Sequence, residues 1–149
     1  MRTAAMADIP EILAFWQAAA EDAHRPPDNP AALRQLIDRD PDALILAEED
    51  GRLVGTVIAG WDGWRCHLYR LAVALDRRRQ GIGGALLEQA EERLRTLGGT
   101  RADAMVLQEN EPAHHAWQAN GYRLQPEWAR WVKPLAPDGR PASTRQHPR

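Results

Sequence analysis

The sequence is poor in cysteine and in lysine, with one residue of each, Cys66 and Lys133, in a chain of 149. A single cysteine excludes an intramolecular disulfide framework and a multi-cysteine zinc site. No apolar run approaches the about 20 residues that cross a bilayer, so no association with a membrane is predicted. The 19 basic and 21 acidic residues nearly cancel, which argues against a general nucleic-acid-binding protein.

Several sequence patterns of other protein classes are missing as well. The motifs His-Glu-x-x-His and Cys-x-x-Cys are absent, and the five histidines are scattered, so we expect no metal. Asp8, Pro10 and Glu11 stand where a signal peptide needs an apolar stretch, which predicts a cytoplasmic protein. The excess of arginine over lysine and the abundance of alanine are typical of GC-rich, bacterial genomes. Length and composition predict one domain over residues 1–135 and a disordered tail over residues 136–149.

The hydrophobic pattern predicts a mixture of helices and strands. Asp8 is expected to cap the first helix. The helical spacing of Ile9, Ile12 and Trp16 places them on one face of that helix. An Asp-Gly turn between two short apolar runs predicts a β-hairpin. The expected segments are a helix from residue 9, a helix at 31–39, strands at 43–47, 53–59 and 66–73, a helix at 81–97, a strand at 104–107, a helix at 111–120, and closing strands at 122–124 and 129–132.

A glycine-rich segment, Arg-Arg-Gln-Gly-Ile-Gly-Gly at residues 78–84, joins an apolar strand to an amphipathic helix. Glycine lets the backbone approach a ligand closely, and the free N–H groups at a helix N-terminus attract anions. With Arg77, Arg78 and Arg79 beside it, the loop predicts a phosphate-bearing ligand; the alternative is a glycine-rich turn without a ligand. The Gly-Lys pair of a P-loop is absent, and Leu86 stands where a dinucleotide fingerprint needs its third glycine.

Two spaced motifs in this sequence resemble those of the GCN5-related N-acetyltransferases, the GNAT family. After the strand that ends near residue 73, Arg78-x-x-Gly81-x-Gly83 matches the family signature Arg/Gln-x-x-Gly-x-Gly/Ala, whose backbone amides hold the pyrophosphate of coenzyme A. The order of the expected elements agrees over about residues 1–135. The second family motif, Asn-x-x-Ala followed by an aromatic residue and a Gly-aromatic pair, is matched by Asn110, Ala113, Trp117, Gly121 and Tyr122.

The resemblance implies an α/β fold with a mixed, mostly antiparallel central sheet of six to seven strands and about four flanking helices. Strands 4 and 5 of such a sheet splay apart and take the pantetheine arm between them. The resemblance also implies acetyl-CoA as the co-substrate, without a metal, and places the Val73 N–H near the thioester carbonyl. The residues expected to bind the coenzyme are Leu71, Ala72, Val73, Arg78, Arg79, Gln80, Gly81, Ile82, Gly83, Gly84, Asn110 and Trp117.

Attack of an amine on a thioester requires a neutral amine, whereas a primary amine with a pKa of about 10.4 is almost wholly protonated at neutral pH. Strand alternation predicts that His67, Tyr69, Leu71 and Val73 share one face. Histidine suits the task of a general base. We therefore expect His67 to be catalytic, with Tyr69 lining the pocket or relaying a proton. The alternatives are a packed or exposed strand histidine and a tyrosine that only packs in the core.

The sequence leaves several alternatives for the proton donor to the leaving group. Trp117 stands where many family members carry a tyrosine that protonates the departing thiolate, and an indole N–H is no practical acid. Departure as the free thiolate, protonation by water, and protonation by His114 or His115 are the open alternatives. Cys66 is expected to be a packed thiol on the face opposite His67.

The acceptor is expected at loops 21–30 and 125–128 and at the turn near residue 61. Carboxylates and tryptophans in these segments suit a cationic amine through charge pairing and cation–π contact. The expected acceptor-binding residues are Asp22, His24, Trp61 and Trp128. The predicted function is acetyl-CoA-dependent transfer of an acetyl group to a primary amine of a small molecule or peptide. The alternative is a non-catalytic acyl-CoA-binding or regulatory domain. A longer acyl group and a homodimer are both left open.

Overall fold

A five-stranded sheet forms the centre of the computed structural model, which describes residues 1–20 and 27–136. The strands lie in the order β1-β2-β3-β4-β5, and all neighbours are antiparallel except β4 and β5. Together with four α-helices among the described residues, this sheet confirms the expected fold class. The elements are β1 (Arg2–Thr3), η1 (Met6–Asp8), α1 (Ile9–Ala19), α2 (Pro30–Arg39), β2 (Leu44–Glu49), β3 (Arg52–Trp61), β4 (Cys66–Val73), η2 (Leu75–Arg77), α3 (Ile82–Thr96), β5 (Ala102–Ala104) and α4 (Glu111–Ala119).

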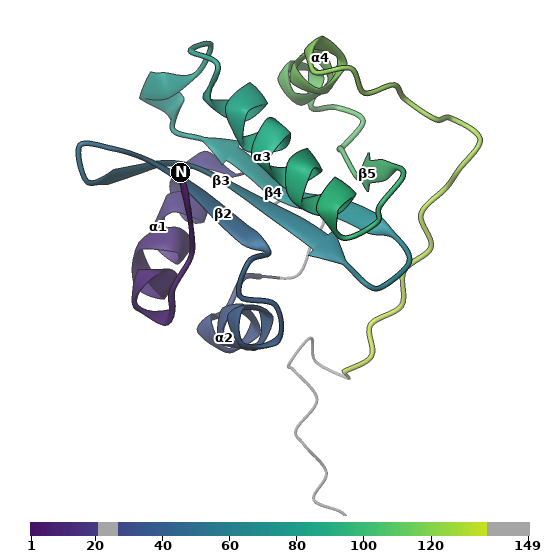
Figure 1. Ribbon diagram of the computed structural model, residues 1–149. Coiled ribbons are helices and arrows are strands. Elements are labelled where there is room, and N and C mark those ends of the chain that lie inside the picture. Colours follow the sequence, from purple (N-terminus) through teal and green to yellow (C-terminus); the bar gives the residue numbers. More distant parts are fainter. Residues whose placement is uncertain (21–26, 137–149) are drawn as a thin grey trace, which may run out of the picture.

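Helices cover both faces of the sheet. α1 and α2 lie on one face, and α3 and α4 lie on the other (Figure 1). One buried cluster joins Trp16 of α1 and Leu33 of α2 to Leu46, and a second joins Leu86 and Leu87 of α3 to the opposite face. The two clusters hold the middle of the sheet rigidly, because the close packing of each leaves little room for movement. Among residues 1–20 and 27–136, no helix is both long and apolar enough to cross a membrane.

The helix starts follow the sequence, although their side-chain caps do so only in part. Asn110 caps α4 as expected, because its Oδ1 accepts a hydrogen bond from the Ala113 N–H at 3.2 Å. α2 begins with the same kind of asparagine cap. Asp8 is the N-cap residue of α1 as expected, but its side chain makes no capping hydrogen bond to that helix. The Asp8 carboxylate instead accepts from the Ala5 N–H at 2.7 Å and binds Arg2 at 2.7 Å.

A β-bulge interrupts β4 and changes the direction of its side chains. The three steps from Tyr69 to Ala72 oppose only two steps on β3. Arg70, within the bulge, has a left-handed backbone with a φ of +50°. Leu68 and Leu71, an odd number of residues apart, consequently both pack toward α3. The expectation of one shared face is wrong, because the bulge separates two pairs of residues: His67 with Tyr69, and Leu71 with Val73.

The closing strands expected at 122–124 and 129–132 are also wrong, so the sheet has five strands instead of six to seven. Residues 105–136 are all described and contain α4 but no strand. The strand expected at 104–107 is instead β5, which ends at Ala104 after three residues. So short an edge gives a further strand little to pair with. The predicted tail lies outside the described residues from residue 137 onward.

Candidate active site

The glycine-rich segment forms the turn between β4 and α3 and leaves the start of α3 open. Gly81 is the N-cap residue with a φ of +83°, and Arg79 before it has a φ of +61°. No side chain of the described residues caps this helix, so its first backbone N–H groups lack a capping acceptor. A Cβ at Gly81 would meet nothing within 4 Å, which shows that glycine serves the left-handed backbone here. The turn has the geometry of an anion site.

The protein itself uses part of the positive charge beside this turn. Arg77 Nε binds the Glu49 carboxylate at 2.8 Å. Arg78 donates from Nε to the Val73 carbonyl at 3.4 Å and from Nη2 to the Ala19 carbonyl at 3.3 Å. The two residues after Arg78 are exposed. The expected cluster of three arginines is therefore divided, because one is paired with a carboxylate and one ties the end of α1 to β4.

Beside the turn, β4 and β5 part from each other. Their pairing ends at Leu68 with Ala104, whereas β4 continues to Val73. The last part of β4 pairs with β3, through Val73 and Gly55, and on the side of β5 this part pairs with no other strand among the described residues. A Cβ at Gly83 would meet only Val73 Cγ2, at 3.6 Å. The open start of α3 and the open edge of β4 are thus neighbours, as the expected splay requires.

In the paired half of β4, the imidazole of His67 lies between two carboxylates. Nδ1 is 2.6 Å from Oδ1 of Asp103, the register partner of His67 on β5. Nε2 is 3.9 Å from Oδ2 of Asp62. The Tyr69 ring lies 6.0 Å from the imidazole, and burial, with a smaller effect of Asp103, raises the pKa of its phenol. Sequence patterns do not reveal Asp103, because it is 36 residues from His67 and meets it only through the parallel register.

The aromatic residues of the second motif pack against each other. The Trp117 and Tyr122 rings meet edge to face, with centroids 4.8 Å apart. The Tyr122 hydroxyl donates to Glu91 at 2.8 Å, and burial together with this carboxylate raises the pKa of Tyr122. His114 Nε2 lies 2.9 Å from the Leu107 carbonyl, so it secures the loop before α4. The Tyr122 hydroxyl is therefore already engaged by Glu91.

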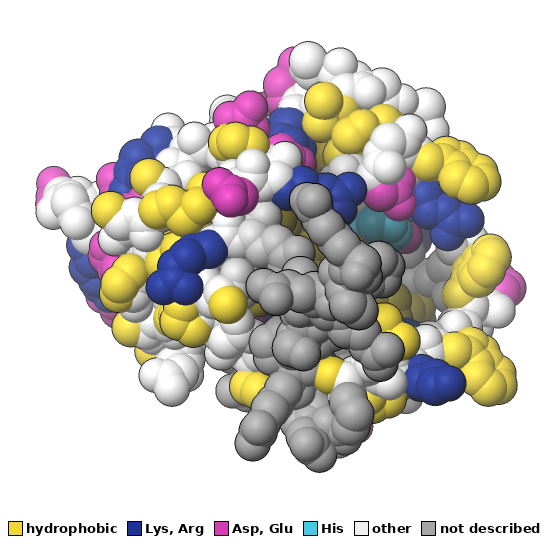
Figure 2. All heavy atoms as spheres, turned by 90° about the horizontal axis from the view of Figure 1, so that it is seen from below, with side chains coloured by type: hydrophobic (Ala, Val, Ile, Leu, Met, Phe, Trp, Pro, Cys, Tyr) yellow, Lys and Arg dark blue, Asp and Glu magenta, His cyan; other side chains and the backbone are white. Residues whose placement is uncertain are grey.

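The residues expected to bind the acceptor are only partly brought together. Asp22 and His24 lie outside the described residues. Trp61 packs against the core cluster under α3, whereas Trp128 is 71% exposed. On the face seen in Figure 2, histidine atoms lie beside acidic and basic side chains, and hydrophobic side chains project nearby. An exposed charged surface with aromatic groups is thus present, but Trp61 belongs mainly to the core.

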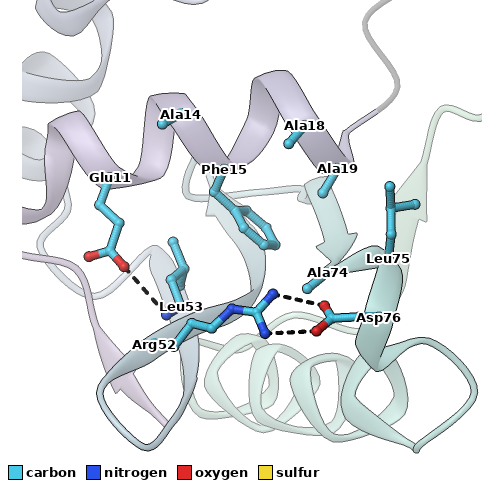
Figure 3. A pocket seen from close by; sticks show the side chains of 10 residues that line it. All are labelled: Glu11, Ala14, Phe15, Ala18, Ala19, Arg52, Leu53, Ala74, Leu75 and Asp76. Atoms are coloured by element: carbon cyan, nitrogen blue, oxygen red, sulfur yellow. Dashed lines mark hydrogen bonds and ion pairs between the residues drawn. The ribbon is translucent and has the colours of Figure 1, made fainter.

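A groove of about 410 Å³ lies apart from the imidazole, between α1 and the start of β3 (Figure 3). Phe15 and several alanines of α1 form one wall, and Ala74 and Leu75 contribute to the other. At one side Arg52 binds Asp76 through two hydrogen bonds of 2.8 Å. This guanidinium lowers the pKa of Asp76 to about 2. The groove is mostly apolar, and its charged lining residues are the Arg52–Asp76 pair and Glu11, which accepts from the Leu53 N–H at 3.4 Å.

Comparisons with known proteins agree with this geometry. The sequence pattern of the acetyltransferase (GNAT) family matches residues 9–122. An acetyltransferase of Sodalis glossinidius is 30% identical over 119 residues, which are 79% of this chain and 82% of the relative. The solved ribosomal-protein-alanine N-acetyltransferase of Brucella melitensis is 26% identical, with a TM-score of 0.66 over 80% of this chain and 82% of that one.

A second solved structure supports the fold alone. The aminoglycoside antibiotic 6'-N-acetyltransferase of Acinetobacter haemolyticus is 17% identical, with a TM-score of 0.68 over 91% of this chain and 98% of that one. The matched residues 9–122 include the turn before α3, the splayed strands and the second motif. The chain therefore belongs to the acetyltransferase (GNAT) family and is an N-acetyltransferase.

Proposed function

We propose that this enzyme takes the acetyl group from acetyl-CoA and transfers it to a primary amine of a small molecule or peptide. The observation that carries the proposal is the uncapped start of α3 beside the unpaired end of β4. Backbone N–H groups at a helix start suit the oxygens of a pyrophosphate. The free edge of β4 offers N–H and C=O groups to the amides of the pantetheine arm. Glycine at the turn fits such a ligand, because the backbone there carries no Cβ to hold it away.

The proposed coenzyme site keeps the residues expected from the sequence, with the side-chain role of Arg78 changed. Its guanidinium already binds two backbone carbonyls, so we assign it to holding the turn. The Val73 N–H stabilises negative charge on the thioester oxygen during attack. When bound, the coenzyme supplies an activated acyl group whose thiol, with a pKa of about 8.5 like that of cysteine, leaves as a thiolate.

We assign the base to His67, which takes a proton from the acceptor amine before or during attack. Its imidazole is partly exposed and lies beside two carboxylates that suit a cationic substrate. The alternative of a non-catalytic domain was suggested by Trp117, and the family relationship speaks against it. The name of the Brucella relative points to a peptide amine, which we include among the acceptor classes, and we expect the enzyme to work in the cytoplasm.

The proposed function is tested by measuring thiol release from acetyl-CoA with a panel of amines, including polyamines, aminoglycosides and peptides with an N-terminal alanine. His67→Gln should lower kcat/KM for the best acceptor by a factor of about 10² to 10⁴. Coenzyme affinity, measured by calorimetry, should not change. Glu88→Gln is the control, since Glu88 is an exposed residue on α3 to which no role is assigned. An equal loss of rate in both variants, or in neither, would contradict the assignment of His67.

A further inference from the structure

Asp103 is the one group that contacts Nδ1 of the His67 imidazole at hydrogen-bond distance among the described residues, at 2.6 Å. The contact is built into the sheet, because β4 and β5 run parallel and pair His67 directly with Asp103. An ionised carboxylate only accepts hydrogen bonds. The hydrogen of the neutral imidazole must then reside on Nδ1, which leaves the lone pair of Nε2 for another partner.

Asp62 lies on the other side of the imidazole but does not hold it. Its Oδ2 is 3.9 Å from His67 Nε2, beyond the range of a hydrogen bond. Its Oδ1 accepts from the N–H groups of Trp64 and Arg65 at 2.8 and 2.6 Å. These backbone bonds lower the pKa of Asp62 and fix it in the turn between β3 and β4. Nε2 consequently faces a fixed negative charge across a gap, where an amine nitrogen can bind to both.

We propose that Asp103 is a positioning residue for the reaction: it holds His67 as the tautomer whose Nε2 accepts the proton of the acceptor amine. The inference rests on the proposed function, in which His67 is the base. In the step, a proton passes from the ammonium nitrogen to Nε2, and the freed electron pair forms a bond to the thioester carbon while the C=O π pair moves onto oxygen. When the C=O bond re-forms, the C–S bond breaks and its electron pair leaves on sulfur, and the second proton of the amide nitrogen passes to the thiolate or to water. Asp103 takes no proton; its charge also stabilises the imidazolium that forms.

The substitution Asp103→Asn tests the inference. The side-chain amide that it introduces offers N–H groups that suit an unprotonated Nδ1, so the hydrogen should move to Nε2 and block the base. We expect kcat/KM for the best acceptor to fall by a factor of about 10² to 10⁴, with unchanged coenzyme affinity and circular dichroism. Asp103→Glu, which restores a carboxylate, should recover part of the rate. Asp42→Asn, the same change at an exposed turn residue, should leave the rate unchanged.

Nitrogen-15 NMR of the full-length protein reads the tautomer independently of activity. The His67 resonances are identified by their absence in His67→Gln. We expect the Nδ1–H form in the wild type and in Asp62→Asn, and the Nε2–H form in Asp103→Asn. An unchanged tautomer in Asp103→Asn would overturn the proposal, and so would a changed tautomer with an unchanged rate. If the wild type acetylates no amine of the panel, the proposed function fails, and the NMR spectra still decide whether Asp103 sets the tautomer.

Discussion

The two halves of β4 differ in what they offer to a reaction. The first half is paired on both sides, with β3 and with β5, and presents the side chain of His67 between two carboxylates. Within the part of the chain that the structure describes, the second half is paired with β3 only and presents its backbone next to the open start of α3. In the proposed function, side-chain chemistry thus lies where the sheet is complete, and backbone binding of the coenzyme lies where the sheet is open.

The bulge at Arg70 makes this division possible. It inverts the alternation of side chains, so that His67 points away from the α3 face while Leu71 packs toward it. The Thr56 hydroxyl donates to the Arg70 carbonyl at 2.8 Å and accepts from the Trp16 indole at 2.9 Å. The bulge is therefore fixed from the core of the protein. The two proposed sites can share one strand because a single extra residue separates them.

A change at the start of α3 tests the open half of β4. Gly83→Asp places a negative charge at the start of α3, opposite a pyrophosphate, and should weaken acetyl-CoA binding about 10- to 100-fold, or about 1.4–2.8 kcal/mol. Gly83→Ala separates the effect of the added Cβ from that of the charge, because within the protein its Cβ makes only an ordinary contact with Val73, at 3.6 Å. Calorimetry on folded variants measures both. Equal affinity of the aspartate variant and the wild type would place the coenzyme elsewhere.

The next substitution removes the hydrogen bonds that support the bulge between the two halves of β4. Thr56 is fully buried, so Thr56→Val leaves the Trp16 N–H and the Arg70 carbonyl without this partner and should lower the free energy of unfolding by about 2 kcal/mol. Urea unfolding measures the change. Thr56→Ser keeps the hydroxyl and should lose less than the valine variant. Were serine the more damaging replacement, packing of the methyl group rather than the hydrogen bonds would hold the bulge.

A smaller effect is expected at Trp117 on α4. If the thiolate leaves without an acid, Trp117→Phe should keep the contact with Tyr122 and change turnover less than about threefold, below 1 kcal/mol. Trp117→Tyr adds a phenol with an ordinary pKa of about 10 and should keep or raise turnover. Steady-state thiol release measures both variants. Abolished turnover in a folded Trp117→Phe that still binds coenzyme would assign a role to the indole N–H.

The smallest effect is expected at Asp8, which lies outside β4 and serves as a reference for the changes in both halves of that strand. Arg2 lowers the pKa of Asp8 to about 2, from an ordinary value of 3.8. A lowered folded-state pKa means that the stabilisation is complete above pH 3.8 and is lost as the pH falls through 2. Because Arg2 is 42% exposed, the contribution is below about 1 kcal/mol. The stability difference between wild type and Asp8→Asn should shrink from about pH 4 to about pH 2 in urea titrations, and acetyl transfer at neutral pH should be unaffected.

Local signals predicted the parts of the fold that depend on neighbouring residues. The turn before α3 follows from Gly81 and its neighbours, because few residues other than glycine adopt a φ of +83°. The start of α4 follows from Asn110, whose side chain reaches a backbone N–H three residues later. The strands expected at 122–124 and 129–132 failed for the opposite reason. Strand-forming residues need a partner edge, and β5 ends at Ala104.

The sequence by itself determined the family, the glycine turn, the asparagine cap of α4 and the presence of a histidine on β4, since each depends on residues a few positions apart. Only the tertiary structure decided that Asp103 meets His67, because the parallel register joins residues 36 positions apart. It also decided that His67 and Leu71 lie on opposite faces of the sheet, because Thr56 and Trp16, on other elements, stabilise the bulge between them. Alternation along a strand is a local rule, and a single inserted residue, held by distant hydrogen bonds, reverses it.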